Sequence, residues 1–113
     1  MNCNRVPYRE FDSYTEYGNA ALNYSIAAYR KGNTVTITFF NTTAQLLKAV
    51  TFDEQYRPPQ LMDFSAGNAG GYPIVARMTT GGIISDLWQF NNGSVSNVPN
   101  TGVAVNGTIT FCA

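Results

Sequence analysis

The stretch from Tyr29 to Phe39 constrains the fold more than any other part of the chain. A Lys-Gly-Asn turn at residues 31–33 separates two runs in which apolar and polar residues alternate. Alternation with a period of two is the pattern of a half-buried β-strand, and a glycine turn between two such runs predicts a β-hairpin. The same pattern returns around Gly82 and around Gly107, and Asn91-Asn92-Gly93-Ser94 is another turn signal. The sequence therefore predicts an all-β domain.

Strand and turn signals along the chain give the expected architecture. In residues 34–39 the apolar side chains face inward and the threonines face outward. Prolines at 58 and 59 interrupt regular structure. Seven or eight short antiparallel strands are expected, a number that suits a β-sandwich or a jelly roll. The segments expected to form strands are 22–29, 34–40, 60–66, 72–79, 83–90 and 103–111, the last bent or divided by a turn at Asn106-Gly107.

Two segments allow a second interpretation. Residues 20–29 contain alanine and leucine, which favour helix. Their period-two alternation leads directly into a hairpin turn, so strand is the better prediction. Residues 46–52 fit a short helical turn and a strand equally well.

The first 19 residues differ in composition from the rest. They hold five of the fourteen charged side chains and four aromatic ones, with weak periodicity. We interpret residues 1–19 as an extended arm or connector that lies on a neighbouring surface, and residues 20–113 as the β-sandwich domain. The alternative is that residues 1–19 contain an N-terminal strand of the same domain. No apolar segment resembles a secretory signal or a membrane span.

The low charge of the chain points to surfaces that contact other copies. Seven basic and seven acidic side chains give a formal net charge of zero, which argues against a nucleic-acid binder with its basic stripe. Only 12% of residues are charged, and the chain holds twelve Asn and twelve Thr. Charged side chains are the usual protection of exposed sheet edges. We therefore infer that neighbouring copies cover the edges.

The two cysteines lie almost at the two ends of the chain. A disulfide between Cys3 and Cys112 would constrain the unfolded state by on the order of 4 kcal/mol, because it closes nearly the whole chain. The alternative is a pair of reduced thiols. Because the chain has no histidine, two cysteines cannot complete a four-ligand zinc site. We expect no metal and no cofactor.

The sequence offers little material for catalysis. Histidine, the commonest general base, is absent. The adjacent carboxylates Asp53 and Glu54 would point to opposite faces of a strand. Asp63 and Asp86 could meet across strands, as the two carboxylates of a glycosidase do at a separation of roughly 5–9 Å. Solvated charges at strand ends are the simpler interpretation, and we expect no enzymatic activity.

Three residues are candidates for ligand contact. Trp88 is the sole tryptophan, and an exposed indole beside Asn91 could stack on a saccharide and hydrogen-bond to it. Alternation places Trp88 on one strand face with Ile84 and Asp86. The alternative role of Trp88 is in the core or a subunit interface. Tyr72, beside a glycine-rich loop, is a similar candidate.

A second group of residues is expected to be structural. Tyr56, Arg57 and Pro58 form an elbow between strands, in which the prolines hold the backbone extended. Arg57 could pair with Asp53 and fix this elbow.

The order of these pieces resembles the small β-sandwich domains at the ends of tailed-bacteriophage fibres and baseplate appendages, with related modules in fibres on phage heads. The resemblance covers about residues 20–112. Gln55 replaces a glycine that is usual before the elbow tyrosine, and the terminal cysteines and residues 1–19 lie outside the shared pattern. The pieces that carry the resemblance are Tyr29-Arg30-Lys31-Gly32-Asn33-Thr34-Val35, Gln55-Tyr56-Arg57-Pro58-Pro59, Ala76-Arg77-Met78-Thr79-Thr80-Gly81-Gly82-Ile83 and Asn106-Gly107-Thr108-Ile109-Thr110-Phe111.

The resemblance implies a virion protein on the particle surface, built as a homotrimer. It implies adhesion to the host surface, often to saccharides, or decoration of the particle, with residues 1–19 contacting other virion proteins. Two alternatives remain open. One is a capsid-associated cementing or head-fibre protein without a ligand, and the other is a bacterial carbohydrate-binding module that is monomeric.

Overall fold

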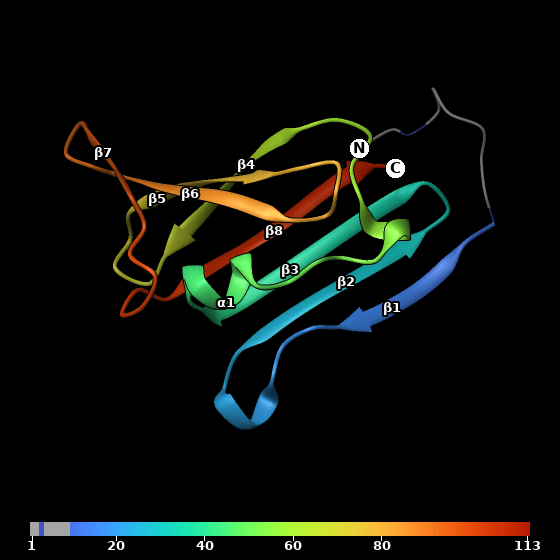
Figure 1. Ribbon diagram of the computed structural model, residues 1–113, viewed down its shortest axis with the longest axis horizontal. Coiled ribbons are helices and arrows are strands. Elements are labelled where there is room, and N and C mark those ends of the chain that lie inside the picture. The colour runs from blue at the N-terminus through green and yellow to red at the C-terminus, as the bar shows by residue number, and fades with distance from the viewer. Residues whose placement is uncertain (1–2, 4–9) are drawn as a thin grey trace.

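A computed structural model of the protein describes Cys3 and residues 10–113 (Figure 1). All eight strands described there belong to one antiparallel sheet, in the order β1-β2-β3-β8-β4-β5-β6-β7. In chain order the elements are β1 (Asp12–Glu16), the 3-10 helix η1 (Ala20–Leu22), β2 (Ser25–Lys31), β3 (Thr34–Thr42), α1 (Ala44–Lys48), the 3-10 helix η2 (Glu54–Tyr56), β4 (Met62–Asn68), β5 (Pro73–Met78), β6 (Ile84–Asn91), β7 (Ser94–Asn97) and β8 (Val105–Cys112).

The sheet consists of two halves joined at a narrow contact. β8 pairs with β3 along most of its length, from Val105 to Cys112. It pairs with β4 at only two positions, Gly67 with Asn106 and Asn68 with Val105. We call β1, β2, β3 and β8 the first half-sheet, and β4 to β7 the second half-sheet. In Figure 1, β5 and β6 run at a clear angle to β2, β3 and β8.

The inward side chains of both half-sheets form one hydrophobic core. β3 and β8 contribute Ile37 and Ile109, β5 and β6 contribute Ala76 and Leu87, and α1 adds Leu47, all of them buried. Burial of such side chains is the main favourable term in folding. The core thus connects two half-sheets that share few backbone hydrogen bonds.

The structure confirms the all-β class and the predicted seven to eight strands. It does not confirm a sandwich or a jelly roll, because the strands described form a single hydrogen-bonded sheet. The narrow contact between β4 and β8 is where the single sheet changes direction.

The predicted hairpins form where local turn chemistry is strong. β2 and β3 are joined at Gly32, whose φ of 59° is a conformation that glycine adopts without steric cost. β6 and β7 are joined by Asn92 and Gly93, both with positive φ, as a tight two-residue hairpin turn requires. The inward side chains of β3 and β5 are buried as the alternation predicts; they are Val35, Ile37, Phe39, Ile74, Ala76 and Met78.

The predicted turn at Asn106-Gly107 is wrong, because both residues lie inside β8. A Cβ atom at position 107 would lie 2.7 Å from Phe39 Cζ, so glycine lets the buried Phe39 ring pass close to the strand. Asn106 Oδ1 accepts a hydrogen bond from the backbone N–H of Asn41 at 2.7 Å. These two residues therefore serve the contact with β3 rather than a chain reversal.

At the two segments for which the sequence allowed both helix and strand, a side-chain cap accompanies a short helix. Residues 20–22 form η1 instead of the start of a strand, and Asn19 caps this helix by accepting from the N–H of Ala21. The ambiguous 46–52 segment overlaps the end of α1, whose N-cap Thr43 accepts from the N–H of Leu46. A side-chain cap satisfies an amide that would otherwise lack a partner at the start of a helix.

The described part of the N-terminal segment matches the alternative interpretation, a strand of the same domain. Residues 12–16 form β1, which pairs antiparallel with β2 at one edge of the sheet. Cys3 and Cys112 are joined by a disulfide, with Cα atoms 5.3 Å apart. The rest of the predicted arm, residues 1–2 and 4–9, lies outside the described residues. In the described part of the chain, no helix has the length and apolar character needed to cross a membrane.

Candidate binding surfaces

The elbow residues Tyr56, Arg57 and Pro58 tie the connector before β4 to the rest of the fold. Tyr56 is fully buried. The Ser13 hydroxyl donates to Tyr56 Oη at 2.9 Å, and Thr15 Oγ1 lies 2.9 Å from the same atom. The elbow therefore fastens η2 to the edge strand β1.

The predicted ion pair between Arg57 and Asp53 does not form. Arg57 Nε donates to the carbonyl oxygen of Phe52 at 3.0 Å instead. Between residues 10 and 113, the one ion pair closer than 4.0 Å joins Arg77 to Asp63. Arg57 thus fixes the elbow through a backbone carbonyl.

The outer face of β4, β5 and β6 carries Trp88 together with a row of charges, and we call it the tryptophan face. The strand register places Arg77 opposite Asp63 on one side and opposite Asp86 on the other. Arg77 donates to both oxygens of Asp63, at 2.8 and 3.1 Å. These hydrogen bonds hold the pKa of Asp63 below its ordinary value.

The strand register places Arg77 between the carboxylates of Asp63 and Asp86. A glycosidase needs both carboxylates to face one cleft, with one of them holding a proton. Here the Arg77 guanidinium stands between them and keeps Asp63 ionised. The arrangement is a row of alternating charges on the outer face of the sheet, with Arg77 paired to Asp63.

Trp88 is half-buried, and the Arg77 guanidinium carbon lies 5.0 Å above the ring centroid. This cation–π contact occupies ring surface that a sugar would need. Trp88 shares its face with Asp86, as predicted, but not with Ile84. The register shifts between Arg77 and Met78, so that Ile84 joins Leu87 in the core.

The three predicted ligand residues do not converge on one site. Tyr72 is exposed in the turn between β4 and β5, where its backbone N–H donates to Asn68 Oδ1. Asn91 ends β6 three residues after Trp88, and side chains at odd spacing on a strand point to opposite faces. The buried Oδ1 atom of Asn91 has no hydrogen-bond partner in the described structure.

The outer face of the first half-sheet carries its charged residues, Asp12, Glu16 and Lys31, on β1 and β2, and we call it the threonine face. The strand register aligns its side chains in rows across the strands. β3 and β8 contain no charged residue. The rows are Tyr14–Tyr29–Thr36–Thr110 and Glu16–Ala27–Thr38–Thr108, with Ser25–Phe40 beyond them.

Large apolar side chains on the threonine face are open to solvent. The exposed fractions are 60% for Tyr14, 42% for Tyr29 and 64% for Phe40. The Tyr14 and Tyr29 rings lie side by side with centroids 6.3 Å apart. Sequence reasoning assigned Tyr14 to a connector and did not single out Phe40. Residues 12–16, Asp-Ser-Tyr-Thr-Glu, show no apolar-polar alternation, so the sequence held no clear signal that places Tyr14 on a strand.

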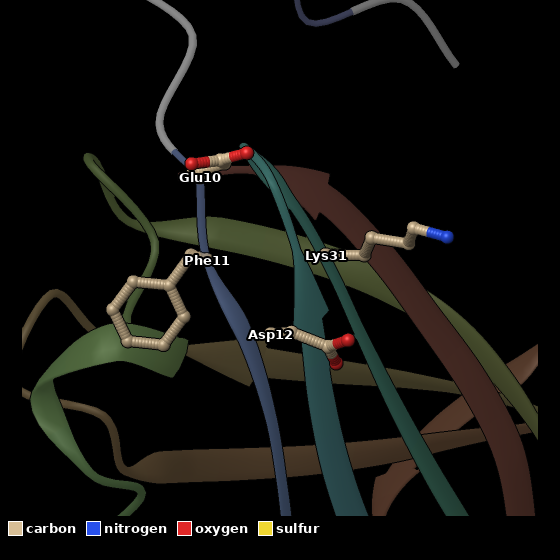
Figure 2. Close-up of a pocket in the computed structure, with 4 residues that line it drawn as sticks. All are labelled: Glu10, Phe11, Asp12 and Lys31. Carbon is tan, nitrogen blue, oxygen red and sulfur yellow. The ribbon is translucent and has the colours of Figure 1, made fainter.

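One open depression of about 410 Å³ lies at the start of β1. It is lined by Glu10, Phe11, Asp12 and Lys31. Figure 2 shows that Phe11 lies on one side of β1 while Asp12 and Lys31 lie on the other. The described lining side chains therefore do not converge on one point.

Neither metal chemistry nor a known relative adds to this picture. Across Cys3 and residues 10–113, no group of three or more His, Cys, Asp or Glu side chains is placed to hold a metal ion. Comparisons of the chain with protein-family models, curated proteins and solved structures find no match. The surfaces themselves carry the functional argument.

Proposed function

We propose that this chain is a fibre-type appendage module of a bacteriophage particle that works as a homotrimer. Its outer surfaces contact sister copies, other virion proteins or the host surface. The family is proposed from the sequence resemblance of residues 20–112. A role in binding rather than catalysis is proposed from the threonine face.

The single observation that supports the proposal most strongly is the composition of the threonine face. Its exposed Tyr14, Tyr29 and Phe40 stand beside two strands without a charge. Protein interfaces are enriched in aromatic residues and depleted of charges in their central part. A contiguous exposed patch of this kind marks an interaction surface.

The sheet edges support association between copies. β1 and β7 are the two ends of the strand order, so each leaves backbone groups without a strand partner on one side. All four residues of β7 are exposed, and none is charged. An uncharged edge of this kind readily pairs with another chain unless something covers it.

Sedimentation of the purified protein and immunoelectron microscopy of intact particles test this proposal. We expect one species of three times 12.4 kDa, and antibody labelling of an appendage on the particle. A stable species of 12.4 kDa would contradict the trimer and favour the carbohydrate-binding module. Labelling confined to the capsid shell, without binding to host polysaccharide, would favour the cementing protein.

A pair of variants tests whether the threonine face is the surface between copies. Replacing Thr36 and Thr110 by lysine puts two like charges on adjacent strands, and burying them in an interface is strongly unfavourable. We expect this variant to be monomeric and folded. Lysine at the exposed Ser65, on the tryptophan face, is the control and should leave the trimer intact. A trimeric T36K/T110K variant would place the interface elsewhere.

A further inference from the structure

A small hollow of about 120 Å³ lies where the end of β1 meets the start of β2. Its lining includes three small residues, Gly18, Ala20 and Ala27. Gly18 permits this shape, because a Cβ atom there would lie 2.6 Å from the backbone nitrogen of Ile26. The backbone N–H of Gly18 donates to the Ile26 carbonyl at 3.0 Å, which holds the two segments together.

The small size of Ala27 accounts for the depression on the threonine face. Ala27 stands between Tyr29 and Ser25 on β2, and its partner on β1 is Glu16. The neighbouring row carries the larger side chains of Tyr14 and Tyr29. Tyr14 of this row lines the hollow, together with Tyr24.

Polar and aromatic groups surround this hollow. The Tyr14 ring is 60% exposed, and its hydroxyl donates to Glu16 Oε1 at 2.8 Å. This hydrogen bond to Glu16 raises the pKa of Tyr14. The other carboxylate oxygen of Glu16 makes no hydrogen bond to the described residues, and Ser25 presents an exposed hydroxyl.

We propose that this hollow binds a neutral hexopyranose, such as a terminal sugar of a host-surface polysaccharide. A pyranose has an apolar C–H face, which the Tyr14 ring can cover, and hydroxyl groups, which Glu16 and Ser25 can bind. A carboxylate acceptor gives stronger hydrogen bonds than a neutral one. A concave site with a few placed polar groups is the usual form of a small-ligand site.

The charge of Glu16 selects among sugars. Among the described residues, no basic side chain lines the hollow, so the carboxylate of an acidic sugar would meet Glu16 without compensation there. Such a like-charge contact excludes competing ligands. The site should therefore prefer neutral pyranoses to uronic acids.

This inference names a ligand and a binding site for the proposed adhesion to the host surface, and it rests on that proposed function. It differs from the sequence prediction in location, because the hollow lies on the first half-sheet and Trp88 lies on the second. The Trp88 ring is in contact with Arg77, whereas the Tyr14 ring is 60% exposed.

Nuclear magnetic resonance titration of the ¹⁵N-labelled full chain tests the site. The probes are methyl α-D-glucopyranoside, methyl β-D-galactopyranoside and methyl N-acetyl-β-D-glucosaminide, with methyl β-D-glucuronide as the acidic counterpart. We expect at least one neutral sugar to shift the amides of Glu16, Ser25 and Ala27, with a dissociation constant on the order of 1 mM. The glucuronide should bind more weakly.

Two variants and a control sharpen the test. Ala27→Leu fills the hollow and should abolish binding. Ser65→Leu adds the same side chain at an exposed position on the tryptophan face and should leave the affinity unchanged. Glu16→Gln keeps the shape, should weaken neutral-sugar binding about tenfold by loss of the charged acceptor, and should remove the discrimination against the glucuronide.

Several results would overturn the proposal. These are the absence of amide shifts with all three neutral sugars, shifts confined to Trp88 and its neighbours, or an unchanged affinity of Ala27→Leu. If Ala27→Leu does not fold, an unchanged affinity of Glu16→Gln decides against the site. If the Ala27→Leu variant is monomeric and the parent protein binds no sugar, a sister copy covers the hollow and the sugar proposal is wrong. Sugar binding by a monomeric parent would support the hollow and overturn only the trimer.

Discussion

The outer faces of the two half-sheets use their polar and aromatic side chains in opposite ways. On the tryptophan face, Arg77 contacts both Asp63 and the Trp88 ring, so the charged and aromatic groups that could bind a ligand already bind one another. On the threonine face, Tyr14 and Phe40 are open to solvent beside uncharged strands. Groups that already have partners gain little from a new one, because binding exchanges existing contacts for new ones. Adhesion and assembly are therefore expected of the threonine face.

The two half-sheets also differ in how they are held. The first is tied by a disulfide and by the Tyr56 hydroxyl, whereas the second depends on the core and on its own hairpins. Four variants test the contacts that hold the two half-sheets and their outer faces.

The largest effect is expected from removal of the disulfide on the first half-sheet. Replacing Cys3 and Cys112 by serine opens a loop whose ends are 109 residues apart. The free energy of unfolding should fall by on the order of 4 kcal/mol, because the unfolded chain regains its freedom. Urea denaturation measures this change. An unchanged denaturation midpoint would mean that the disulfide constrains neither state.

A smaller loss is expected at the junction of the half-sheets. Gly107→Ala would bring a methyl group to 2.7 Å from Phe39 Cζ and 3.1 Å from Ala66 Cβ. Such overpacking should lower the free energy of unfolding by about 2 kcal/mol. The control is Gly67→Ala in β4, where the nearest atom would be 4.0 Å away, and it should be neutral or slightly stabilising. Equal losses in the two variants would show that backbone freedom, and not the Phe39 ring, is responsible.

Removal of the Tyr56 hydroxyl tests the tie between η2 and β1. Tyr56→Phe leaves the half-buried hydroxyls of Ser13 and Thr15 without this partner and should cost about 1–2 kcal/mol. Hydrogen exchange of the β1 amides should become faster than in the parent protein, while exchange of the β5 amides should stay unchanged. Tyr14→Phe removes an exposed hydroxyl and should leave the denaturation midpoint unchanged. Unchanged β1 exchange in Tyr56→Phe would show that other contacts hold this edge.

The smallest effect is expected on the tryptophan face. Arg77→Ala should return the pKa of Asp63 upward to its ordinary value, because the hydrogen bond that lowers it is lost. A carboxyl whose pKa is lowered by folding adds stability above the pKa of the unfolded chain and loses it as the pH falls through the folded pKa. Arg77→Ala should therefore flatten this acid-range dependence slightly.

Carbon-13 titration of Asp63 and Trp88 fluorescence measure the Arg77→Ala variant. The emission of Trp88 should shift to the red as its cover is removed. Lys31→Ala removes a charge from the first half-sheet and should leave both signals unchanged. If the Asp63 pKa does not move in Arg77→Ala, the ion pair does not persist in solution.

Turn chemistry and alternation predicted much of the local structure. Gly32 and the Asn92-Gly93 pair identified two hairpins, because their positive φ angles are a property of few residue types. The same rule failed at Asn106-Gly107, where glycine serves the close approach of Phe39. A local pattern cannot separate these two uses of glycine, because the second depends on a strand some seventy residues away.

The candidate site was predicted only in its general character. Surplus aromatic residues and a low charge indicated exposed contact surfaces, but the sequence pointed to Trp88 while the open rings belong to the other half-sheet. The pairing of β1 with β2 places Tyr14 beside Tyr29, and the register of Arg77 with Asp63 and Asp86 covers the tryptophan. Contacts of this kind come from strand register rather than from residue type.

By itself the sequence determined the class of structure, since short alternating runs between glycine turns have no other stable arrangement than antiparallel strands. It also determined the absence of histidine chemistry and the neutrality of the surface. Only the tertiary structure decided that β8 pairs with β3, that β1 belongs to the sheet and that Cys3 meets Cys112. The physical reason is distance along the chain. Turns form from a few neighbouring residues, whereas these pairings must overcome loop-closure entropy and depend on the packing of the whole core.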